Sequence, residues 1–395
     1  MDKNVQVGYE VEMKILIVAP GTPNRFHRIR LKHIIDSLTP DHEITGCYLN
    51  IGGSSYSKKE RERYIEGKPK FLSIADSFLF LAFPQPLEVS YCYSPNLQKK
   101  VRELIPFHDV IIVKRLRALQ YVPRDSKIPI IIDSTDAMSL FYQKALSSVP
   151  LWQKPLYFEE WIKYLLYEKW ASSHFKNWVV CSYDDAKYLK EVLAPDAKVW
   201  VIPNVVDTRY YSPRSSPEKN TIVFSGLMEK HVNQSAIYFF IDSIFPKIKR
   251  VIPQVKLVIA GPNPPARLTS YQKDKAVRVL GEVPDIREVI SKASVVITPT
   301  LIGTGMRNKI LQALAIERPV VTTVVGAQGI NKELKGALLI SDDPDKFSES
   351  VITLLTKPSL GEKMAKKGRE LIEKYYSLET MRAKYNEVIA SIVRK

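Results

Sequence analysis

The sequence predicts an α/β protein of two doubly wound domains, each with a parallel sheet covered by helices on both faces. Three observations support this prediction. Twelve short β-branched runs alternate with helical patterns along the 395 residues. Such alternation indicates parallel strands that are connected through helices. A turn-rich stretch after Pro203 separates the runs into two sets, and about six strands per set is an ordinary number for one such domain.

The first half of the chain starts with an apolar run directly after Met13. Its predicted strands are Lys14–Ala19, Glu43–Leu49, Asp109–Lys114, Ile128–Ile132, Trp178–Ser182 and Lys198–Ile202. Helical patterns lie between them at 28–38, 156–173 and 184–193. Asp184 and Asp185 are interpreted as residues at a helix start.

The second half repeats this alternation. Its predicted strands are Thr221–Ser225, Lys256–Ala260, Val277–Leu280, Ser294–Thr298, Pro319–Thr323 and Ala337–Ile340. The predicted helices are 234–250, 307–315, 360–374 and 378–393. The pair Asp342–Asp343 again fits a helix start rather than a metal site.

The domain boundary is placed where turn residues gather. The stretch 203–220 contains three prolines and is interpreted as a linker. We therefore expect an N-terminal extension at 1–12, a first domain at 13–203 and a second domain at 204–377. A terminal helix at 378–395 is expected to be able to cross back to the first domain.

Composition limits the class of protein. The three cysteines, Cys47, Cys92 and Cys181, are far apart and odd in number, which argues against a disulfide scaffold and a secreted protein. No run of eighteen apolar residues is present, and the polar start of the chain does not fit a signal peptide. These features favour a cytoplasmic protein.

The net charge of +16 points to an anionic partner, such as a nucleotide, a phosphate or an acidic lipid. Residues 201–395 carry +11 of this charge and residues 1–200 carry +5. No nucleic-acid-binding motif is recognised, so nucleic acid is not expected as a partner. The alternative is an ordinary solvated surface with many lysines.

The strongest local pattern is 299–315, where a predicted strand is followed by a two-glycine loop and a helix. Arg307 and Lys309 are expected in the first turn of that helix, where positive side chains oppose the helix dipole. A bound diphosphate would remove this conflict, held by free backbone N–H groups, the dipole and the two cations. Gly303 and Gly305 would let the backbone approach the phosphates. The alternative is an ordinary loop with exposed basic residues.

Two further loops follow predicted strands and carry basic residues. The loop 226–233 contains Lys230, which can supply a phosphate contact, and the loop 20–30 contains three arginines. Ligands of parallel α/β sheets bind beyond the carboxyl ends of the strands, so both loops are candidate binding loops. The alternatives are a surface lysine beside a helix cap at Asn233 and a solvated basic turn.

As a set, these motifs resemble family 4 (group 1) retaining glycosyltransferases with the GT-B fold. The matching segments occur in family order at 202–207 (IPNVVD), 224–226 (FSG), 257–261 (LVIAG), 281–285 (GEVPD), 303–315 (GTGMRNKILQALA), 319–323 and 326–330. The first half is more weakly similar to bacterial polysaccharide sugar transferases, through 20–30, 115–121 and 133–139. The resemblance covers about 13–390 of the chain.

The resemblance implies two Rossmann-like domains facing a central cleft. It also implies transfer of a sugar, with retention, from a nucleotide-diphosphate sugar to a glycan or lipid-linked acceptor, in surface polysaccharide or glycoconjugate synthesis. The enzyme would be hexosyltransferase-like and metal-independent, with Arg307 and Lys309 stabilising the departing diphosphate. It would need no cofactor, because the nucleotide-sugar is a co-substrate. The implied donor-binding residues are Gly226, Lys230, Gly303, Thr304, Gly305, Met306, Arg307, Lys309, Ile310 and Gln312.

The acceptor is expected on the first domain. Asp133 and Asp136 follow a predicted strand there, and one of them could bind or deprotonate the acceptor hydroxyl. We take Asp136 as a catalytic candidate with Arg307 and Lys309. Structural roles of the two aspartates in a turn or cap are the alternative. The residues expected in the cleft loop are Arg25, Phe26, His27 and Arg28.

The sequence departs from the family at three of these positions. The paired glutamates of the family fall on Thr304 and Gln312, although Gln312 can still accept a hydrogen bond from a ribose through its amide oxygen. Phe26 stands where the family has a glycine close to the donor. The substituted acids at 304 and 312 motivate one alternative function, a non-catalytic GT-B protein that binds nucleotide or glycan as a partner subunit. A sugar-nucleotide epimerase is another alternative and would need acid and base carboxylates in the cleft.

Membrane contact is a further expectation. The basic segment Ser57–Lys70 precedes the apolar segment Phe71–Phe83, and such a pair can dock on an anionic membrane. Contact of this kind would place the protein at the inner face of the cell membrane.

Overall fold

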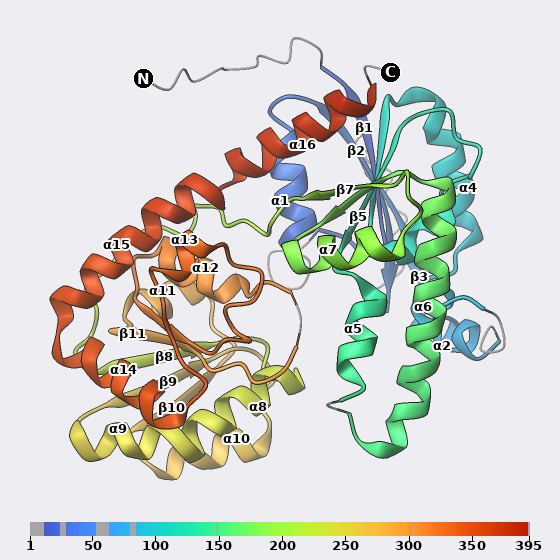
Figure 1. The fold of residues 1–395 in the computed structure, drawn as a ribbon. Coiled ribbons are helices and arrows are strands. Elements are labelled where there is room, and N and C mark those ends of the chain that lie inside the picture. Colours follow the sequence, from blue (N-terminus) through green and yellow to red (C-terminus); the bar gives the residue numbers. More distant parts are fainter. Residues whose placement is uncertain are drawn as a thin grey trace. The chain divides into compact units, whose positions relative to one another are not determined.

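The computed structural model describes residues 12–23, 29–52, 63–79, 84–147, 149–303 and 305–393. These residues form two compact units. Unit 1 comprises the described residues up to Pro203 together with those from Met381 onward, and unit 2 is Asn204–Thr380. Each unit contains one parallel sheet with helices on both of its faces (Figure 1). The predicted fold class is thereby confirmed.

Unit 1 has, among the described residues, a seven-stranded sheet in the order β3-β2-β1-β4-β5-β6-β7, with every neighbouring pair parallel. Its strands are β1 (Lys14–Ala19), β2 (Glu43–Ile51), β3 (Arg63–Lys68), β4 (Val110–Lys114), β5 (Ile130–Thr135), β6 (Asn177–Val180) and β7 (Lys198–Val201). Its helices are α1 (Ile29–Leu38), α2 (Lys70–Leu79), α3 (Leu87–Tyr91), α4 (Pro95–Leu104), α5 (Met138–Ala145), α6 (Lys154–His174) and α7 (Tyr183–Val192), with short 3₁₀ turns η1 (Ile105–Phe107), η2 (Leu116–Tyr121) and η3 (Leu151–Gln153).

Strand β3 is an addition to the six strands expected in the first half. It lies at the edge of the sheet and pairs only with β2, and its sequence RYIEGK contains three charged residues. A charged, half-exposed edge strand lacks the apolar alternation on which the prediction depends. Lys68, counted as part of a basic membrane segment, is buried and forms an ion pair with Asp76 at 2.6 Å.

Unit 2 has a six-stranded sheet in the order β10-β9-β8-β11-β12-β13, again parallel throughout. Its strands are β8 (Thr221–Ser225), β9 (Lys256–Ala260), β10 (Val277–Gly281), β11 (Val295–Thr298), β12 (Val320–Thr322) and β13 (Leu339–Ile340). Its helices are α8 (His231–Phe239), α9 (Phe245–Val251), α10 (Ala266–Ser270), α11 (Ile286–Ser291), α12 (Asn308–Ala315), α13 (Lys332–Lys335), α14 (Pro344–Thr356) and α15 (Pro358–Tyr375), with a π-helical turn η4 (Phe240–Ile244) and a 3₁₀ turn η5 (Tyr271–Lys273).

Alternating side chains of the unit 2 strands build two cores, one on each face of the sheet. Ile222 and Phe224 of β8 belong to the core covered by α8, α9 and α14. Val223, between them, belongs to the core covered by α11, α12 and α15. Because both faces are covered, β8 is buried along its whole length, as expected for a central parallel strand.

The expected linker at 203–220 is in part a packed segment of unit 2. Val205, Val206 and Tyr211 are buried, and Val206 donates its backbone N–H to the carbonyl of Tyr376. Apolar side chains among the turn residues fix this stretch to the core formed with α12 and α15. Residues 213–219 keep the exposed character that the prolines predict.

The last helix, α16 (Leu378–Val393), is joined to unit 1 by polar contacts from its middle. Tyr385 donates its hydroxyl to Asp133, Asn386 binds the ring of His42 at 3.0 Å, and Arg382 donates to the carbonyl of Ser37 at 3.0 Å. These contacts make α16 an integral part of unit 1.

Candidate functional site

The strand order of unit 2 reverses direction between β8 and β11. From β8 the sheet continues to β9 and β10, and from β11 it continues to β12 and β13. The loops that follow β8 and β11 therefore leave the sheet in opposite directions, and ligands of open α/β sheets bind at this point. The loop after β8 begins at Gly226, and the loop after β11 leads into α12 with Lys309.

Lys309 crosses this switch point and contacts the β8 loop. Its amine donates to the Oδ1 atom of Asn233 at 2.9 Å and lies 4.3 Å from the ring centre of Phe224. Asn233 in turn donates its amide to the carbonyl of Leu227 at 2.9 Å. A Cβ atom on Gly226 would lie 3.0 Å from the Lys309 amine. The glycine therefore lets Lys309 approach the loop backbone closely.

The charge of Lys309 has no acidic partner among the described residues. Burial, followed by the nearby charge of Arg307, lowers the pKa of its amine to about 7. An amine so perturbed is stabilised in its charged form by an incoming anion. Lys309 therefore has the electrostatic character of an anion-binding residue. This property supports anion binding in addition to its position in a basic helix turn.

Arg307 is the N-cap residue of α12 instead of lying in its first turn as predicted, because its backbone is extended (φ −91°, ψ 100°). Its guanidinium contacts the carbonyl of Ile302 at 3.4 Å. A Cβ atom on Gly303 would lie 2.5 Å from the same guanidinium, and Gly303 and Gly305 both have positive φ values, 116° and 77°. The two glycines thus permit a tight loop that folds back along the arginine.

A second pair of glycines joins the loops after β8 and β9. A Cβ atom on Gly261 would lie only 1.7 Å from the carbonyl oxygen of Gly226. Gly226 also donates its backbone N–H to the carbonyl of Ala260 at 3.0 Å. The backbone next to Lys309 is therefore held in place by a contact that no side chain at 261 permits.

The remaining predicted donor residues lie at different depths. Gln312 donates its amide to the hydroxyl of Tyr211 at 3.0 Å, which leaves its carbonyl oxygen oriented away from that bond. Ile310 is fully buried in the core beside α12, so only its backbone can take part in binding. Met306 is also mostly buried and lies against Gly329. Lys230 is the exposed N-cap residue of α8, with Glu229 nearby at 3.9 Å. Thr304 lies outside the described residues.

In unit 1, Asp136 follows β5 and forms a small polar cluster at the carboxyl end of the sheet. It accepts from Arg115 at 3.2 Å and from the Cys181 thiol at 3.5 Å. Arg115 and Thr135 both have positive φ values, 70° and 72°, which are uncommon for such residues and often occur near functional sites. Asp136 keeps part of its side chain exposed, as a group that contacts an acceptor must.

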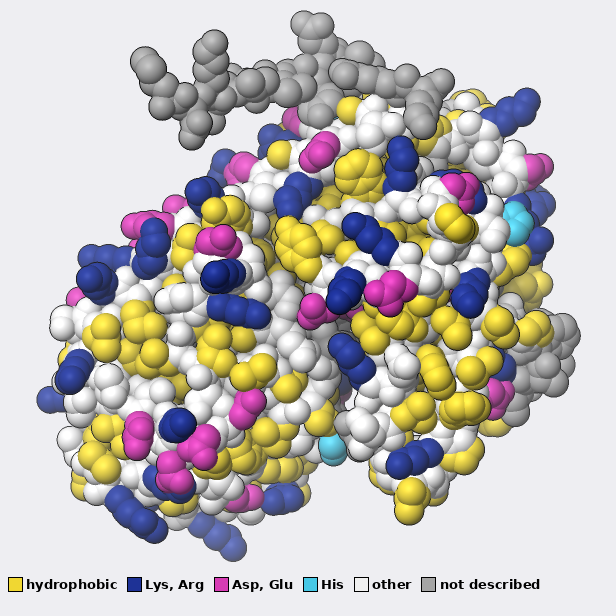
Figure 2. Space-filling model, viewed as in Figure 1, with side chains coloured by type: hydrophobic (Ala, Val, Ile, Leu, Met, Phe, Trp, Pro, Cys, Tyr) yellow, Lys and Arg dark blue, Asp and Glu magenta, His cyan; other side chains and the backbone are white. Residues whose placement is uncertain are grey.

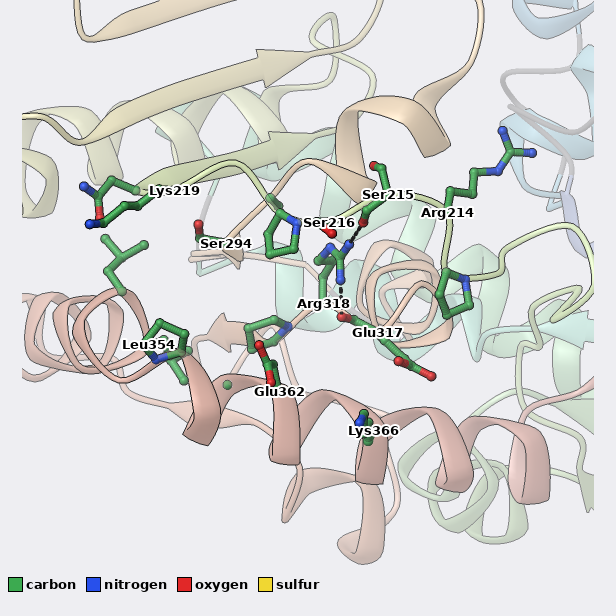
Figure 3. Close-up of a pocket in the computed structure, with 18 residues that line it drawn as sticks. Arg214, Ser215, Ser216, Lys219, Ser294, Glu317, Arg318, Leu354, Glu362 and Lys366 are labelled. Atoms are coloured by element: carbon green, nitrogen blue, oxygen red, sulfur yellow. Dashed lines mark hydrogen bonds between the residues drawn. The ribbon is translucent and has the colours of Figure 1, made fainter.

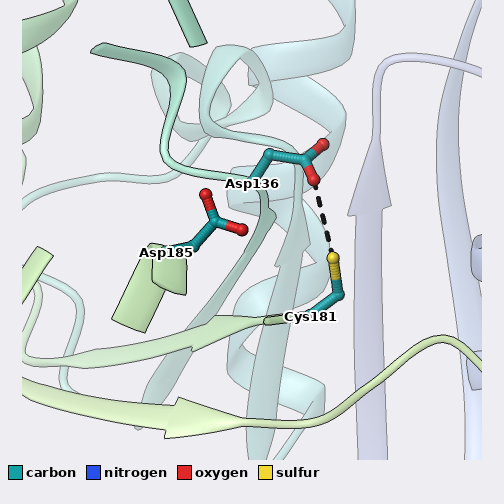
Figure 4. Close-up of side chains that lie close together, drawn as sticks. All are labelled: Asp136, Cys181 and Asp185. Atoms are coloured by element: carbon teal, nitrogen blue, oxygen red, sulfur yellow. Dashed lines mark hydrogen bonds between the residues drawn. The ribbon is translucent and has the colours of Figure 1, made fainter. Parts of the chain in front are cut away.

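Asp136, Cys181 and Asp185 have potential metal-ligand atoms within 4.8 Å of one another (Figure 4). Asp185 is already bound by the N–H of Ala137 at 3.1 Å and by the Ser182 hydroxyl at the start of α7. Burial, followed by the charge of Asp136, raises the pKa of the Cys181 thiol, which keeps it in the neutral form that binds metals poorly. These partners give the cluster a structural role: it stabilises the start of α7 and the loop after β5.

Asp133 has a different environment from the one predicted for an acceptor residue. It is completely buried and forms ion pairs with Arg30 and Lys114, both at 2.9 Å, in addition to the Tyr385 contact. Arg30 also donates to the carbonyls of Ile202 and Pro203. Burial alone would raise the pKa of Asp133, but Arg30 and Lys114 hold it well below its usual range. Asp133 therefore organises the centre of unit 1 and offers no exposed oxygen to an acceptor.

The predicted cleft-loop residues, Arg25, Phe26, His27 and Arg28, lie outside the described residues. Sequence reasoning also missed two members of the unit 2 site. The sequence motif around the first strand of the second half includes Phe224 and Asn233, and a helix cap is a further interpretation of Asn233, but neither residue is predicted to contact the ligand or Lys309. The signal that could have identified them is their place at the end of β8 and in the first turn of α8, on the two sides of the Gly226 loop.

Known proteins resemble this chain in sequence and in fold. Residues 219–357 match the family model "Glycosyl transferases group 1". One component of the phosphatidylinositol N-acetylglucosaminyltransferase of Arabidopsis thaliana is 26% identical over 164 residues, which are 40% of this chain and 36% of that protein. The chain thus spans only about a third of that relative's length.

Solved structures match over nearly the whole chain. Sucrose-phosphate synthase from Thermosynechococcus elongatus has a TM-score of 0.69 with 13% identity and covers 97% of this chain and 100% of its own. HepE from Anabaena, solved in complex with UDP and glucose, has a TM-score of 0.66 with 14% identity and covers 96% and 100%. The chain therefore has the GT-B fold, and its residues 219–357 match the group 1 glycosyltransferase family.

Proposed function

We propose that this protein is a retaining glycosyltransferase that moves a hexose from a nucleotide-diphosphate sugar to a glycan or lipid-linked acceptor. The family match in unit 2 and the GT-B fold support transfer from an activated sugar. A role in surface polysaccharide or glycoconjugate synthesis is the setting that the sequence motifs favour. HepE, a structural neighbour, has been solved with UDP-glucose, which makes UDP-sugars the first donors to test.

One observation carries the proposal. A lysine without an acidic partner among the described residues lies at the switch point of the unit 2 sheet, against a glycine loop and beside the start of α12. The N–H groups of a helix start, this lysine and a second cation at Arg307 favour two neighbouring phosphates. A diphosphate bound there would place the sugar at the carboxyl edge of the sheet.

The same cations supply the chemistry of the leaving group. Negative charge develops on the diphosphate as the glycosidic bond to it breaks, and Lys309 and Arg307 stabilise that charge. In this proposal they perform the role that a divalent cation has in other enzymes, so the reaction needs neither metal nor cofactor. Gln312 accepts a hydrogen bond from the ribose through its carbonyl oxygen, which takes no part in the bond to Tyr211.

Asp136 is proposed to bind the acceptor hydroxyl from unit 1. It is the more exposed of the two candidate aspartates, and Arg115 holds its carboxylate in one orientation. A carboxylate in this position orients a hydroxyl and accepts its proton as the new bond forms.

Contact with an anionic membrane is proposed through helix α2, at the inner face of the cell membrane. Phe71, Ile74 and Phe78 lie on one face of this helix and are exposed, whereas Ser73 on the other face is buried. The helix is thus apolar toward solvent, the arrangement of an interfacial helix. Hydrophobic side chains also gather on the visible surface over α5 and α6 (Figure 2). Leu151 and Trp152, in the η3 turn between these helices, are exposed. None of the described helices has the length and apolar character needed to span a bilayer.

The membrane contact is tested by flotation with vesicles that contain phosphatidylglycerol. Phe71→Ser with Phe78→Ser should reduce the bound fraction several-fold, whereas Phe107→Ser, an equally exposed phenylalanine of unit 1, should not. Equal flotation of both variants would contradict a role of α2.

The transfer reaction is tested with a panel of nucleotide-sugars and glycan or lipid-linked acceptors, with the anomeric configuration of the product read by NMR. Product of retained configuration, lost in Lys309→Met, supports the proposal. Nucleotide binding without turnover would favour the alternative of a non-catalytic partner subunit. Conversion of the nucleotide-sugar without an acceptor would favour an epimerase.

A further inference from the structure

Unit 2 contains a cavity of about 610 Å³ far from the first turn of α12, at the amino ends of the strands. It lies between the exposed segment 213–219, the starts of β11 and β12, and helices α14 and α15 (Figure 3). Its volume is in the range of small-molecule sites. The proposed donor site lies at the opposite, carboxyl edge of the same sheet.

Arg318 is the central cation of this cavity and is buried. Its guanidinium donates to three backbone carbonyls, those of Ser291 and Glu317 at 2.8 Å and that of Ser215. The carbonyls fix its position but do not neutralise it, and no described carboxylate forms an ion pair with it. Burial, the largest effect, lowers the pKa of Arg318 in spite of the acidic residues nearby.

Two more cationic side chains, Lys219 and Lys366, line the same cavity as Arg318. Lys219 comes from the start of β8 and Lys366 from α15, on different sides of the cavity (Figure 3). Neither forms an ion pair with a described residue, whereas Arg214 is bound by Glu288 at 2.6 Å. Of the two acidic lining residues, Glu317 lies 3.9 Å from Arg369, and Glu362 has no ion-pair partner in the described part of the chain. The cavity therefore has a surplus of positive charge around a fixed guanidinium.

The remainder of the wall is part polar, with Ser215, Ser216, Asn220 and Ser294, and part apolar. Leu354, Leu355 and Pro319 line the apolar part and are largely or completely buried. A cavity with three separate cations, polar side chains and an apolar part of its wall fits a small organic molecule with two anionic groups better than a single inorganic ion. We propose that this cavity binds a phosphorylated carboxylic acid, with Arg318 between the two anionic groups and Lys219 and Lys366 at its ends. This inference does not depend on the proposed transferase activity.

The proposal is tested by calorimetric titration of the full chain with 3-phosphoglycerate. Lys219→Ala with Lys366→Ala removes two exposed charges, so this variant should fold as the wild type does. Its affinity should fall at least about tenfold, as expected from the loss of charge-assisted hydrogen bonds worth about 1.4 kcal/mol or more. Lys275→Ala with Lys363→Ala removes the same charge from exposed positions of unit 2 outside the cavity and should leave affinity unchanged.

Two further titrations separate this cavity from the donor site. Arg307→Ala with Lys309→Ala should keep 3-phosphoglycerate affinity, because those residues lie at the other end of the sheet. Inorganic phosphate should bind more weakly than 3-phosphoglycerate. The proposal is overturned by absence of saturable binding, by loss of binding in the 307/309 variant with retention in the 219/366 variant, or by equal affinity for inorganic phosphate.

Discussion

The lowered pKa of Lys309 predicts that nucleotide affinity falls as the pH rises through neutrality. In the free protein this amine has a pKa of about 7, so a growing fraction is neutral above that pH. A bound diphosphate favours the charged form and raises the pKa again. Binding must therefore be accompanied by proton uptake at any pH between the two values.

The size of the effect follows from the titration. One pH unit above the pKa, about one-tenth of the amine is charged, so affinity falls roughly tenfold per unit, which is about 1.4 kcal/mol. Half of the amine is charged at pH 7 and about one-hundredth at pH 9, so the loss over this range is about fiftyfold. The terminal phosphate of a nucleoside diphosphate has a second pKa of about 6, so it is already largely ionised throughout this range. Its titration therefore contributes little to the pH dependence of affinity.

The assay is calorimetric titration of a nucleoside diphosphate between pH 6.5 and 9, in two buffers of different ionisation heat to count protons. Lys309→Arg should bind without this pH dependence, because an arginine stays charged. Lys309→Met should bind weakly at every pH. Lys114 of unit 1 is a second lysine whose pKa burial lowers to about 7. The Lys309→Met variant retains Lys114, so it separates the effects of the two lysines. A steep slope that persists in Lys309→Met, or a flat profile in the wild type, would refute the assignment to Lys309.

Three further predictions concern stability and recognition. Asp133→Asn breaks a buried ion-pair cluster and should lower the free energy of unfolding in urea by about 3–5 kcal/mol. Tyr385→Phe removes one hydrogen bond to Asp133 and should lower it by about 1.5–3 kcal/mol. Little change in either variant would contradict the central role of Asp133. Gly261→Ala should cost roughly 1–3 kcal/mol and weaken nucleotide binding, because its Cβ atom would overlap the carbonyl of Gly226; an undisturbed variant would show that the two loops separate easily. Gln312→Ala should weaken the binding of a nucleoside diphosphate by about 1 kcal/mol but leave pyrophosphate affinity unchanged in the same titration. Equal losses of affinity for both ligands would place Gln312 at the phosphates.

The sequence was sufficient for the fold because the parallel strands are short, apolar and bounded by turns. Each of the twelve predicted strands has a counterpart in the structure, with ends that differ by a few residues. The seventh strand of unit 1 escaped prediction because β3 is charged and half-exposed at a sheet edge. β3 pairs with the side of β2 that β1 leaves open, and this position is a property of the tertiary structure.

The site was predictable only in part. The cations of 303–312 follow from local pattern, but the contact between Lys309 and Asn233 joins residues 76 positions apart and requires the sheet order. The burial of individual site candidates could not be predicted from the sequence either. Ile310 points into the core and Asp133 lies under α16, since helix faces and a terminal helix from far along the chain decide both environments. A strand-end aspartate looks the same in the sequence whether it binds a ligand or an arginine.

The central claim is that the first turn of α12 and the β8 loop form a nucleotide-diphosphate site. It is tested most directly by titrating UDP, GDP, ADP, dTDP and CMP into the wild type and into Arg307→Ala with Lys309→Ala, after circular dichroism has shown that both are folded. We predict saturable binding of at least one nucleoside diphosphate, weakened about a hundredfold or more in the variant, as two charge-assisted contacts imply. Absence of binding to the wild type by every nucleotide, or equal affinity of the two proteins, would contradict the claim.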